Sequence, residues 1–122
     1  VVATGDGEML MGVGSLATVA MQMPKNLAIL VFDNERYGET GMQETATAVR
    51  ANLEKIAQGC GIVTTKTIRK KGELLSALPH IFDKDGPLFF VIKVRAEPLD
   101  FALPPKDGAF LKDRFRSAVL RG

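Results

Sequence analysis

The sequence predicts an α/β fold in which helices cover both faces of a parallel sheet, giving three layers. Apolar runs alternate with segments of helical periodicity, which is typical of βαβ units. The apolar runs are continuous, as in Phe89 to Ile92, and continuous runs are typical of strands buried on both faces. The predicted strands are residues 1–4, 27–32, 62–68 and 88–94, and the predicted helices are about 8–23, 48–59 and 73–83.

The later helical segments carry further signals. Between Leu53 and Cys60, apolar residues recur at positions i, i+3, i+4 and i+7, so they form one stripe that faces the core. Gly61 follows the stripe, where helices commonly end on a glycine. Pro79 falls inside the next segment, so we expect that helix to kink or stop near Leu78.

The chain is predicted to form one domain over residues 1–122, because its length suits a single hydrophobic core. Its tail, residues 96–122, contains several prolines that impose an extended path. We expect a short helix to follow them, from about Lys106 to Leu120.

Composition narrows the class of protein. With 46% hydrophobic and 25% charged residues and a net charge of +2, the chain has ordinary globular composition. Its basic residues are spread out without a nucleic-acid-binding motif, and no apolar stretch is long enough to span a membrane. The single Cys60 rules out a disulfide within the chain. We therefore expect a cytoplasmic protein without nucleic-acid or membrane partners.

Polar residues follow the first two predicted strands. Gly5-Asp6-Gly7 comes after the first, and Asn34 comes at the end of the second, 26 residues beyond Gly7. That spacing leaves room for a helix and a strand, so Asp6 and Asn34 should lie at the carboxyl ends of two parallel strands, where open α/β sheets bind ligands. A carboxylate and an amide oxygen beside a helix start suit a Mg²⁺ ion that also holds phosphate oxygens.

These residues resemble a known motif. Gly-Asp-Gly, about two dozen residues and then Asn is similar to the diphosphate-binding motif of thiamine diphosphate-dependent enzymes. The segments from Gly5 to Thr18 and from Asp33 to Gln43 resemble the phosphonopyruvate and sulfopyruvate decarboxylases. The resemblance runs from residue 1 to residue 94, and the tail matches loosely. It implies the thiamine diphosphate-binding fold, with this chain as a diphosphate-binding (C-terminal) domain that lacks its N-terminal part.

The resemblance also implies a set of site residues. Asp6, the Asn34 side chain and the backbone carbonyl of Arg36 would ligate Mg²⁺. Backbone N–H groups at the start of the first helix would bind the diphosphate, with the Glu8 side chain turned away from it. The loop 37–43 would lie over the cofactor. The implied cofactor-binding residues are Gly5, Asp6, Gly7, Glu8, Met9, Asn34, Arg36, Tyr37, Gly38, Glu39 and Thr40.

The same resemblance implies a lyase that decarboxylates a 2-oxo acid with thiamine diphosphate and Mg²⁺. In that family the glutamate that activates the cofactor belongs to a separate pyrimidine-binding domain. We therefore expect no catalytic side chain in this chain, a pyrimidine-binding domain or subunit as its partner, and a homo- or hetero-oligomer that is at least dimeric.

Three alternatives stay open. The run from Asn34 to Gln43 also resembles the β chain of 2-oxoacid:ferredoxin oxidoreductases, and a catalytically silent cofactor-binding or regulatory subunit would show the same motif. A nicotinamide dinucleotide site is the third, because Gly12, Gly14 and Ala17 fit Gly-x-Gly-x-x-Ala. That fingerprint must follow its strand directly, and residues 8–11 leave little room for one.

Overall fold

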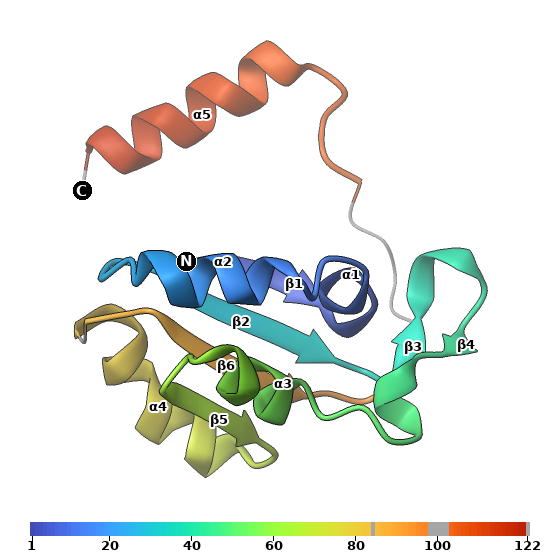
Figure 1. Ribbon diagram of the computed structural model, residues 1–122. Helices are drawn as coiled ribbons and strands as arrows, with labels where there is room; N and C mark the ends of the chain where they lie inside the picture. Colours follow the sequence, from blue (N-terminus) through green and yellow to red (C-terminus); the bar gives the residue numbers. More distant parts are fainter. Residues whose placement is uncertain (84, 98–102, 122) are drawn as a thin grey trace.

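A four-stranded parallel sheet forms the centre of the chain in the computed structural model, which describes residues 1–83, 85–97 and 103–121 (Figure 1). The strand order is β1-β2-β6-β5, and each pair of neighbouring strands is parallel. The strands are β1 (Val2–Gly5), β2 (Ala28–Asp33), β5 (Thr64–Ile68) and β6 (Leu88–Lys93). The predicted α/β class and the four predicted strands are confirmed, with bounds that differ by at most about two residues.

Helices cover both faces of this sheet, as predicted. Side chains of α1, α2 and α3 pack with Ile29 and Phe89 in one core cluster, whereas α4 packs with Leu88 and Phe90 in another. Successive side chains of a strand point to opposite faces, so β2 and β6 each contribute to both clusters. These helices are α1 (Asp6–Met11), α2 (Ser15–Gln22), α3 (Leu53–Cys60) and α4 (Lys71–Asp83).

The predicted helix over residues 8–23 is wrong in one respect, because the structure has two helices there. α1 ends at Met11 and α2 begins at Ser15, and the residues between them include Gly12 and Gly14. Glycine costs roughly 1 kcal/mol more than alanine in a helix interior, which favours a break at this point.

Two other helix bounds need correction. α3 begins at Leu53 and not at residue 48, because the Asn52 side chain accepts a hydrogen bond from the Lys55 N–H at 2.9 Å and caps the helix there. α4 continues through Pro79 to Asp83, so a stop near Leu78 is wrong. Proline has no backbone N–H, so the helix lacks one hydrogen bond at Pro79. Ala77 and Ile81 are buried on either side of it, and their packing stabilises the helix there.

A small hairpin follows β2 at the carboxyl edge of the sheet (Figure 1). Its strands pair antiparallel, with Arg36 opposite Glu44. Glu35 and Met42 adopt positive φ angles of 63° and 62°, one at each side of the hairpin, where the chain turns sharply. The hairpin consists of β3 (Arg36–Tyr37), the 3₁₀ helix η1 (Gly38–Thr40) and β4 (Gln43–Glu44), and a second 3₁₀ turn, η2 (Ala46–Ala48), follows it.

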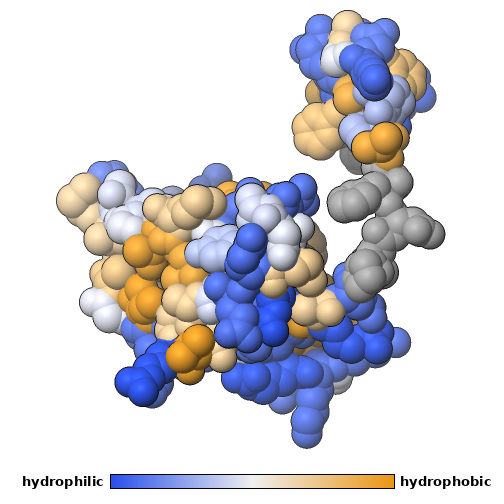
Figure 2. All heavy atoms as spheres, turned by 90° about the vertical axis from the view of Figure 1, so that its right-hand side faces the viewer, coloured by the Kyte–Doolittle hydropathy of each residue, from blue (hydrophilic) through white to orange (hydrophobic). Residues whose placement is uncertain are grey.

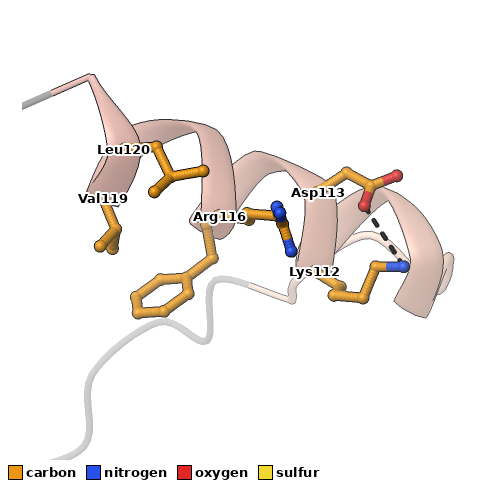
Figure 3. A pocket seen from close by; sticks show the side chains of 6 residues that line it. Lys112, Asp113, Arg116, Val119 and Leu120 are labelled. Carbon is orange, nitrogen blue, oxygen red and sulfur yellow. Dashed lines mark ion pairs between the residues drawn. The ribbon is translucent and has the colours of Figure 1, made fainter.

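The tail ends in α5 (Gly108–Leu120), which confirms the predicted short helix. The expected extended path includes Pro98, which lies outside the described residues. In the view of Figure 1, α5 lies apart from the sheet, and hydrophobic side chains are exposed on it in Figure 2. A hollow along α5 is lined by residues of that helix alone, among them Lys112 and Asp113, whose charged groups pair at 3.3 Å (Figure 3).

Across the described ranges, no helix combines the length and apolarity needed to cross a membrane.

Replacing Leu16 with alanine should destabilise the fold, because this side chain is fully buried between α2 and the sheet. We expect a loss of about 2–5 kcal/mol in the free energy of unfolding, from lost transfer energy and a residual cavity. Leu103→Ala is the matched control, since Leu103 is 85% exposed. Urea unfolding measures both variants, and equal midpoints for the two would contradict the described core.

Candidate functional site

A cavity of about 490 Å³ opens at the carboxyl edge of the sheet, between the end of β1, the end of β2 and the hairpin. Gly5 pairs with Phe32 in the parallel register, so the residues that follow the two strands lie side by side. All of the expected cofactor-binding residues except Met9 line this cavity. The lining residues are Gly5, Asp6, Gly7, Glu8, Met11, Phe32, Asn34, Arg36, Tyr37, Gly38, Glu39, Thr40 and Val94.

Apolar residues account for the differences from the expected set. The Met9 side chain packs into the core cluster under α1, and Met9 does not line the cavity. Met11, Phe32 and Val94 do line it, although no sequence pattern predicted them there. Each of them ends an apolar run, and such runs predict packing in the core. The ends of these runs extend beyond the core and border the cavity.

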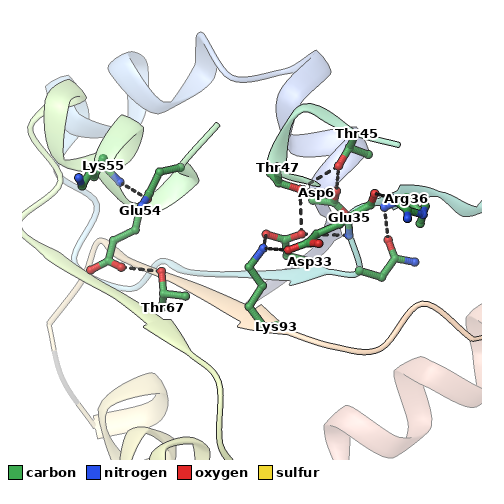
Figure 4. Close-up of polar contacts among 12 residues, drawn as sticks. Asp6, Asp33, Glu35, Arg36, Thr45, Thr47, Glu54, Lys55, Thr67 and Lys93 are labelled. Carbon is green, nitrogen blue, oxygen red and sulfur yellow. Dashed lines mark hydrogen bonds and ion pairs between the residues drawn. The ribbon is translucent and has the colours of Figure 1, made fainter. Parts of the chain in front are cut away.

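Asp6 is the most deeply buried polar residue that lines this cavity, with 1% of its surface exposed. Two hydroxyl groups donate hydrogen bonds to its Oδ2 atom, Thr45 Oγ1 at 2.5 Å and Thr47 Oγ1 at 3.0 Å (Figure 4). Both threonines are themselves buried and lie about forty residues further along the chain. Sequence reasoning missed them, because an isolated threonine after a loop carries no motif.

A second buried carboxylate, Asp33, lies beside this group. Its Oδ1 accepts a hydrogen bond from Thr47 Oγ1 at 2.9 Å, and its Oδ2 pairs with Lys93 Nζ at 2.8 Å (Figure 4). The Lys93 Nζ also pairs with Glu35 Oε1 at 2.6 Å. Burial lowers the pKa of Lys93, but the hydrogen bonds and charges of Asp33 and Glu35 outweigh it and raise that pKa above its ordinary value.

The charges of this cluster do not balance. Asp6, Asp33 and Glu35 are met by the single cation of Lys93, and Asp6 has no ion-pair partner within the described parts of the chain. A buried carboxylate without a counter-charge is costly, so the residues fit a bound cation in the adjoining cavity. No group of three or more His, Cys, Asp or Glu side chains suited to a metal occurs in the described ranges, so amide and backbone oxygens would have to complete its coordination.

Asn34 and Arg36 line the cavity at the same edge and carry oxygens of these two kinds. Asn34 Oδ1 accepts a hydrogen bond from the Arg36 N–H at 2.9 Å, which closes a tight turn just after β2. That oxygen keeps a second lone pair for a cation. The Arg36 guanidinium is held by the hairpin itself, because its Nη1 lies 3.0 Å from the Glu35 carbonyl oxygen and 3.2 Å from Glu44 Oε1.

The Glu8 carboxylate is turned back onto the start of its own helix. Its Oε2 accepts hydrogen bonds from the Gly5 N–H at 3.1 Å and from Thr4 Oγ1 at 2.9 Å. These hydrogen bonds lower the pKa of Glu8 below its ordinary value, and the bond from the Gly5 N–H has a larger effect than the bond from the Thr4 hydroxyl. The protein's own donors therefore occupy this carboxylate.

The nicotinamide dinucleotide alternative is not supported by the structure. Gly12 and Gly14 lie between two helices, whereas the fingerprint needs them between a strand and a helix. The strand-to-helix turn falls at Gly5, where β1 ends and α1 begins.

Comparison with known proteins identifies related sequences. Residues 1–92 match the family described as thiamine pyrophosphate enzyme, C-terminal TPP binding domain. The sulfopyruvate decarboxylase subunit beta of Methanocaldococcus jannaschii is 48% identical over 67 residues, which are 55% of this chain and 36% of that protein. The phosphonopyruvate decarboxylase of Streptomyces viridochromogenes is 37% identical over 120 residues, which are 98% of this chain and 30% of that protein.

A third relative is covered more fully. The sulfopyruvate decarboxylase subunit beta of Methanothermobacter thermautotrophicus is 34% identical over 119 residues, which are 98% of this chain and 61% of that protein. The chain thus spans about a third of the first two relatives and under two thirds of the third.

Gly7→Ala should disturb the site, although alanine is the better helix former. A Cβ at Gly7 would lie 2.7 Å from two ring atoms of Tyr37, so the ring would have to move. We expect a loss of about 1–3 kcal/mol in the free energy of unfolding, as is typical of overpacking. In Gly14→Ala, the matched control, the added Cβ meets nothing within 4 Å, and its unfolding midpoint should not fall. Unfolding by urea measures both, and an unchanged midpoint for Gly7→Ala would refute the contact.

Glu8→Gln should alter the pH dependence of stability. Because the folded pKa of Glu8 is lowered, its contribution is present above the ordinary glutamate pKa of about 4.3 and is lost as the pH falls through the folded value. The variant should therefore unfold at lower urea than wild type near neutral pH, and the two midpoints should converge in acid. Asp85→Asn, at an exposed carboxylate outside the site, is the control. A constant difference across this pH range would contradict the assignment.

Proposed function

The chain belongs to the thiamine pyrophosphate enzymes, whose C-terminal TPP-binding domain it carries, and on that premise we propose that it binds the diphosphate end of thiamine diphosphate through Mg²⁺. The proposed activity is that of a 2-oxo acid decarboxylase, and the chain would supply one part of its site. The decarboxylases among the relatives support this activity over an oxidoreductase.

The buried and unpaired charge of Asp6 is the observation that carries this proposal. The carboxylate borders the cavity, with Asn34 and Arg36 at the same edge, and lacks an ion-pair partner in the described part of the chain. Oxygen donors of these kinds suit Mg²⁺, which is usually held by one or two carboxylates together with phosphate oxygens and waters. Mg²⁺ would supply the missing charge.

The surrounding residues would bind and orient the cofactor. Gly7 lines the cavity in the first turn of α1, where backbone N–H groups have no partner within the helix and would be offered to phosphate oxygens. The residues of η1 border the other side of the cavity and would restrict the access of water. Bound thiamine diphosphate supplies the electron sink for decarboxylation, whereas this chain contributes position and electrostatics.

The remaining part of the site would come from a partner. Two of the relatives carry the name subunit beta, which supports an enzyme assembled from more than one kind of subunit. We propose that a pyrimidine-binding domain or subunit provides the activating glutamate and that the assembly is at least dimeric. A cytoplasmic location is part of the same proposal and is supported by the single free cysteine, Cys60.

Removing either proposed side-chain ligand should weaken cofactor binding. Titration calorimetry of thiamine diphosphate with Mg²⁺ into the assembled enzyme measures the affinity. We expect a loss of at least about tenfold, on the order of 1.4 kcal/mol, for Asp6→Asn, which removes the charge that faces the ion, and for Asn34→Ala, which removes an oxygen ligand. A screen of 2-oxo acids for aldehyde release by wild type would identify the substrate.

Matched controls separate this effect from general damage. Asp85→Asn and Asn26→Ala change the same residue types at exposed positions outside the cavity and should bind the cofactor as wild type does. If Asp6→Asn and Asn34→Ala also bound with wild-type affinity, the assignment of the metal site would be wrong.

A further inference from the structure

We infer that Thr45 and Thr47 are positioning residues, which fix the Asp6 carboxylate so that one of its oxygens is kept for a cation. This inference rests on the proposed function, because it assigns a role toward the same Mg²⁺ site. Both residues lie beyond the two motif segments used to predict that site, since the second segment ends at Gln43. Neither lines the cavity.

The two carboxylate oxygens of Asp6 differ in their hydrogen bonds. Both threonine hydroxyls reach Oδ2, at 2.5 Å and 3.0 Å, and no side-chain hydrogen bond in the described ranges ends on Oδ1 (Figure 4). Thr45 Oγ1 donates to Oδ2, and Thr47 Oγ1 contacts the same oxygen while sharing its one proton with Asp33, so both contacts restrict rotation of the carboxylate about its Cβ–Cγ bond. Oδ1 is therefore the oxygen left for a ligand, and its direction is set before the ligand arrives.

The available protons point to the same conclusion. Each hydroxyl carries one proton, and Thr45 Oγ1 places its own on Asp6 Oδ2, at the shortest distance in the cluster. Thr47 Oγ1 then has a single proton for three nearby acceptors, namely Asp6 Oδ2, Asp33 Oδ1 and the Thr45 oxygen at 2.8 Å. Two hydroxyls thus orient two carboxylates but cannot neutralise them. Lys93 compensates Asp33, and the charge of Asp6 is left for the cation.

The path of the chain connects these threonines to the hairpin that borders the cavity. The Thr45 N–H donates to the Glu35 carbonyl at 3.1 Å, which closes the base of the hairpin just beyond the Arg36 and Glu44 pair. Thr45 and Thr47 therefore reach Asp6 only when the hairpin base is formed. Because both are nearly buried, 1% and 9% exposed, water does not readily replace their hydroxyls. Folding of the hairpin and orientation of the metal ligand are thereby coupled.

Valine substitutions test this role, since valine keeps the shape of threonine and removes the hydroxyl. Thr45→Val and Thr47→Val should each weaken binding of Mg²⁺ with thiamine diphosphate to the assembled enzyme by about tenfold or more in calorimetry. Thr45→Ser and Thr47→Ser keep the hydroxyl and should bind within about threefold of wild type. Thr18→Val, at an exposed position on α2, is the control. Thr47→Val is the less buried change and provides the test if Thr45→Val does not fold.

Two further measurements separate positioning from a purely structural role. In an Asp6→Asn background, Thr47→Val should cause no additional loss of affinity, because the two groups act together. The electron paramagnetic resonance spectrum of Mn²⁺ bound in place of Mg²⁺ should change in the valine variants and not in the serine variants. An equal loss from Thr47→Val in both backgrounds would overturn the inference, as would an unchanged Mn²⁺ spectrum.

The outcomes for the inference and for the proposed function are distinct. If Asp6→Asn binds weakly while both valine variants bind as wild type does, the positioning role is wrong and the proposed function stands. Unchanged binding by Asp6→Asn would instead contradict the proposed function itself.

Discussion

The carboxylate of Asp6 is the constraint on which the functional edge of this molecule depends. A charge that is 1% exposed must be met by hydrogen bonds, by an opposite charge, or by both. The protein provides the hydrogen bonds through Thr45 and Thr47, and in the described residues it places its nearby lysine, Lys93, on the neighbouring Asp33. The protein thus orients Asp6 and leaves its charge unpaired, as expected of a ligand prepared for a cation.

The parallel sheet makes this arrangement possible. The carboxyl ends of parallel strands lie at one edge of the sheet. Asp33 and Lys93 end β2 and β6, and Asp6 and Asn34 directly follow β1 and β2, so all four residues lie at this edge. Buried side chains of β2 and β6 pack against helices on both faces and fix the register. A shift of one strand by a residue would move these polar groups away from one another. Core packing therefore determines the geometry of the site.

Much of this organisation could be predicted from the sequence, because it depends on local patterns. Continuous apolar runs predicted the strands and the two covered faces, and the spacing from Gly7 to Asn34 placed the candidate ligands at one edge. The break between α1 and α2 was missed because apolar periodicity continues across the glycines. Thr45 and Thr47 were missed for a different reason. Their role depends on a hairpin that brings them back to Asp6, and no local pattern shows a contact between residues about forty positions apart.

The proposal that a metal ion binds at Asp6 is tested most directly by the anomalous scattering of Mn²⁺ in crystals of the assembled enzyme with thiamine diphosphate. We predict one peak in the cavity, bound by an oxygen of Asp6, the side-chain oxygen of Asn34 and the backbone carbonyl of Arg36, at distances near the roughly 2.1 Å typical of Mg²⁺. A side-chain cation paired with Asp6, and no metal peak beside it, would contradict the proposed site.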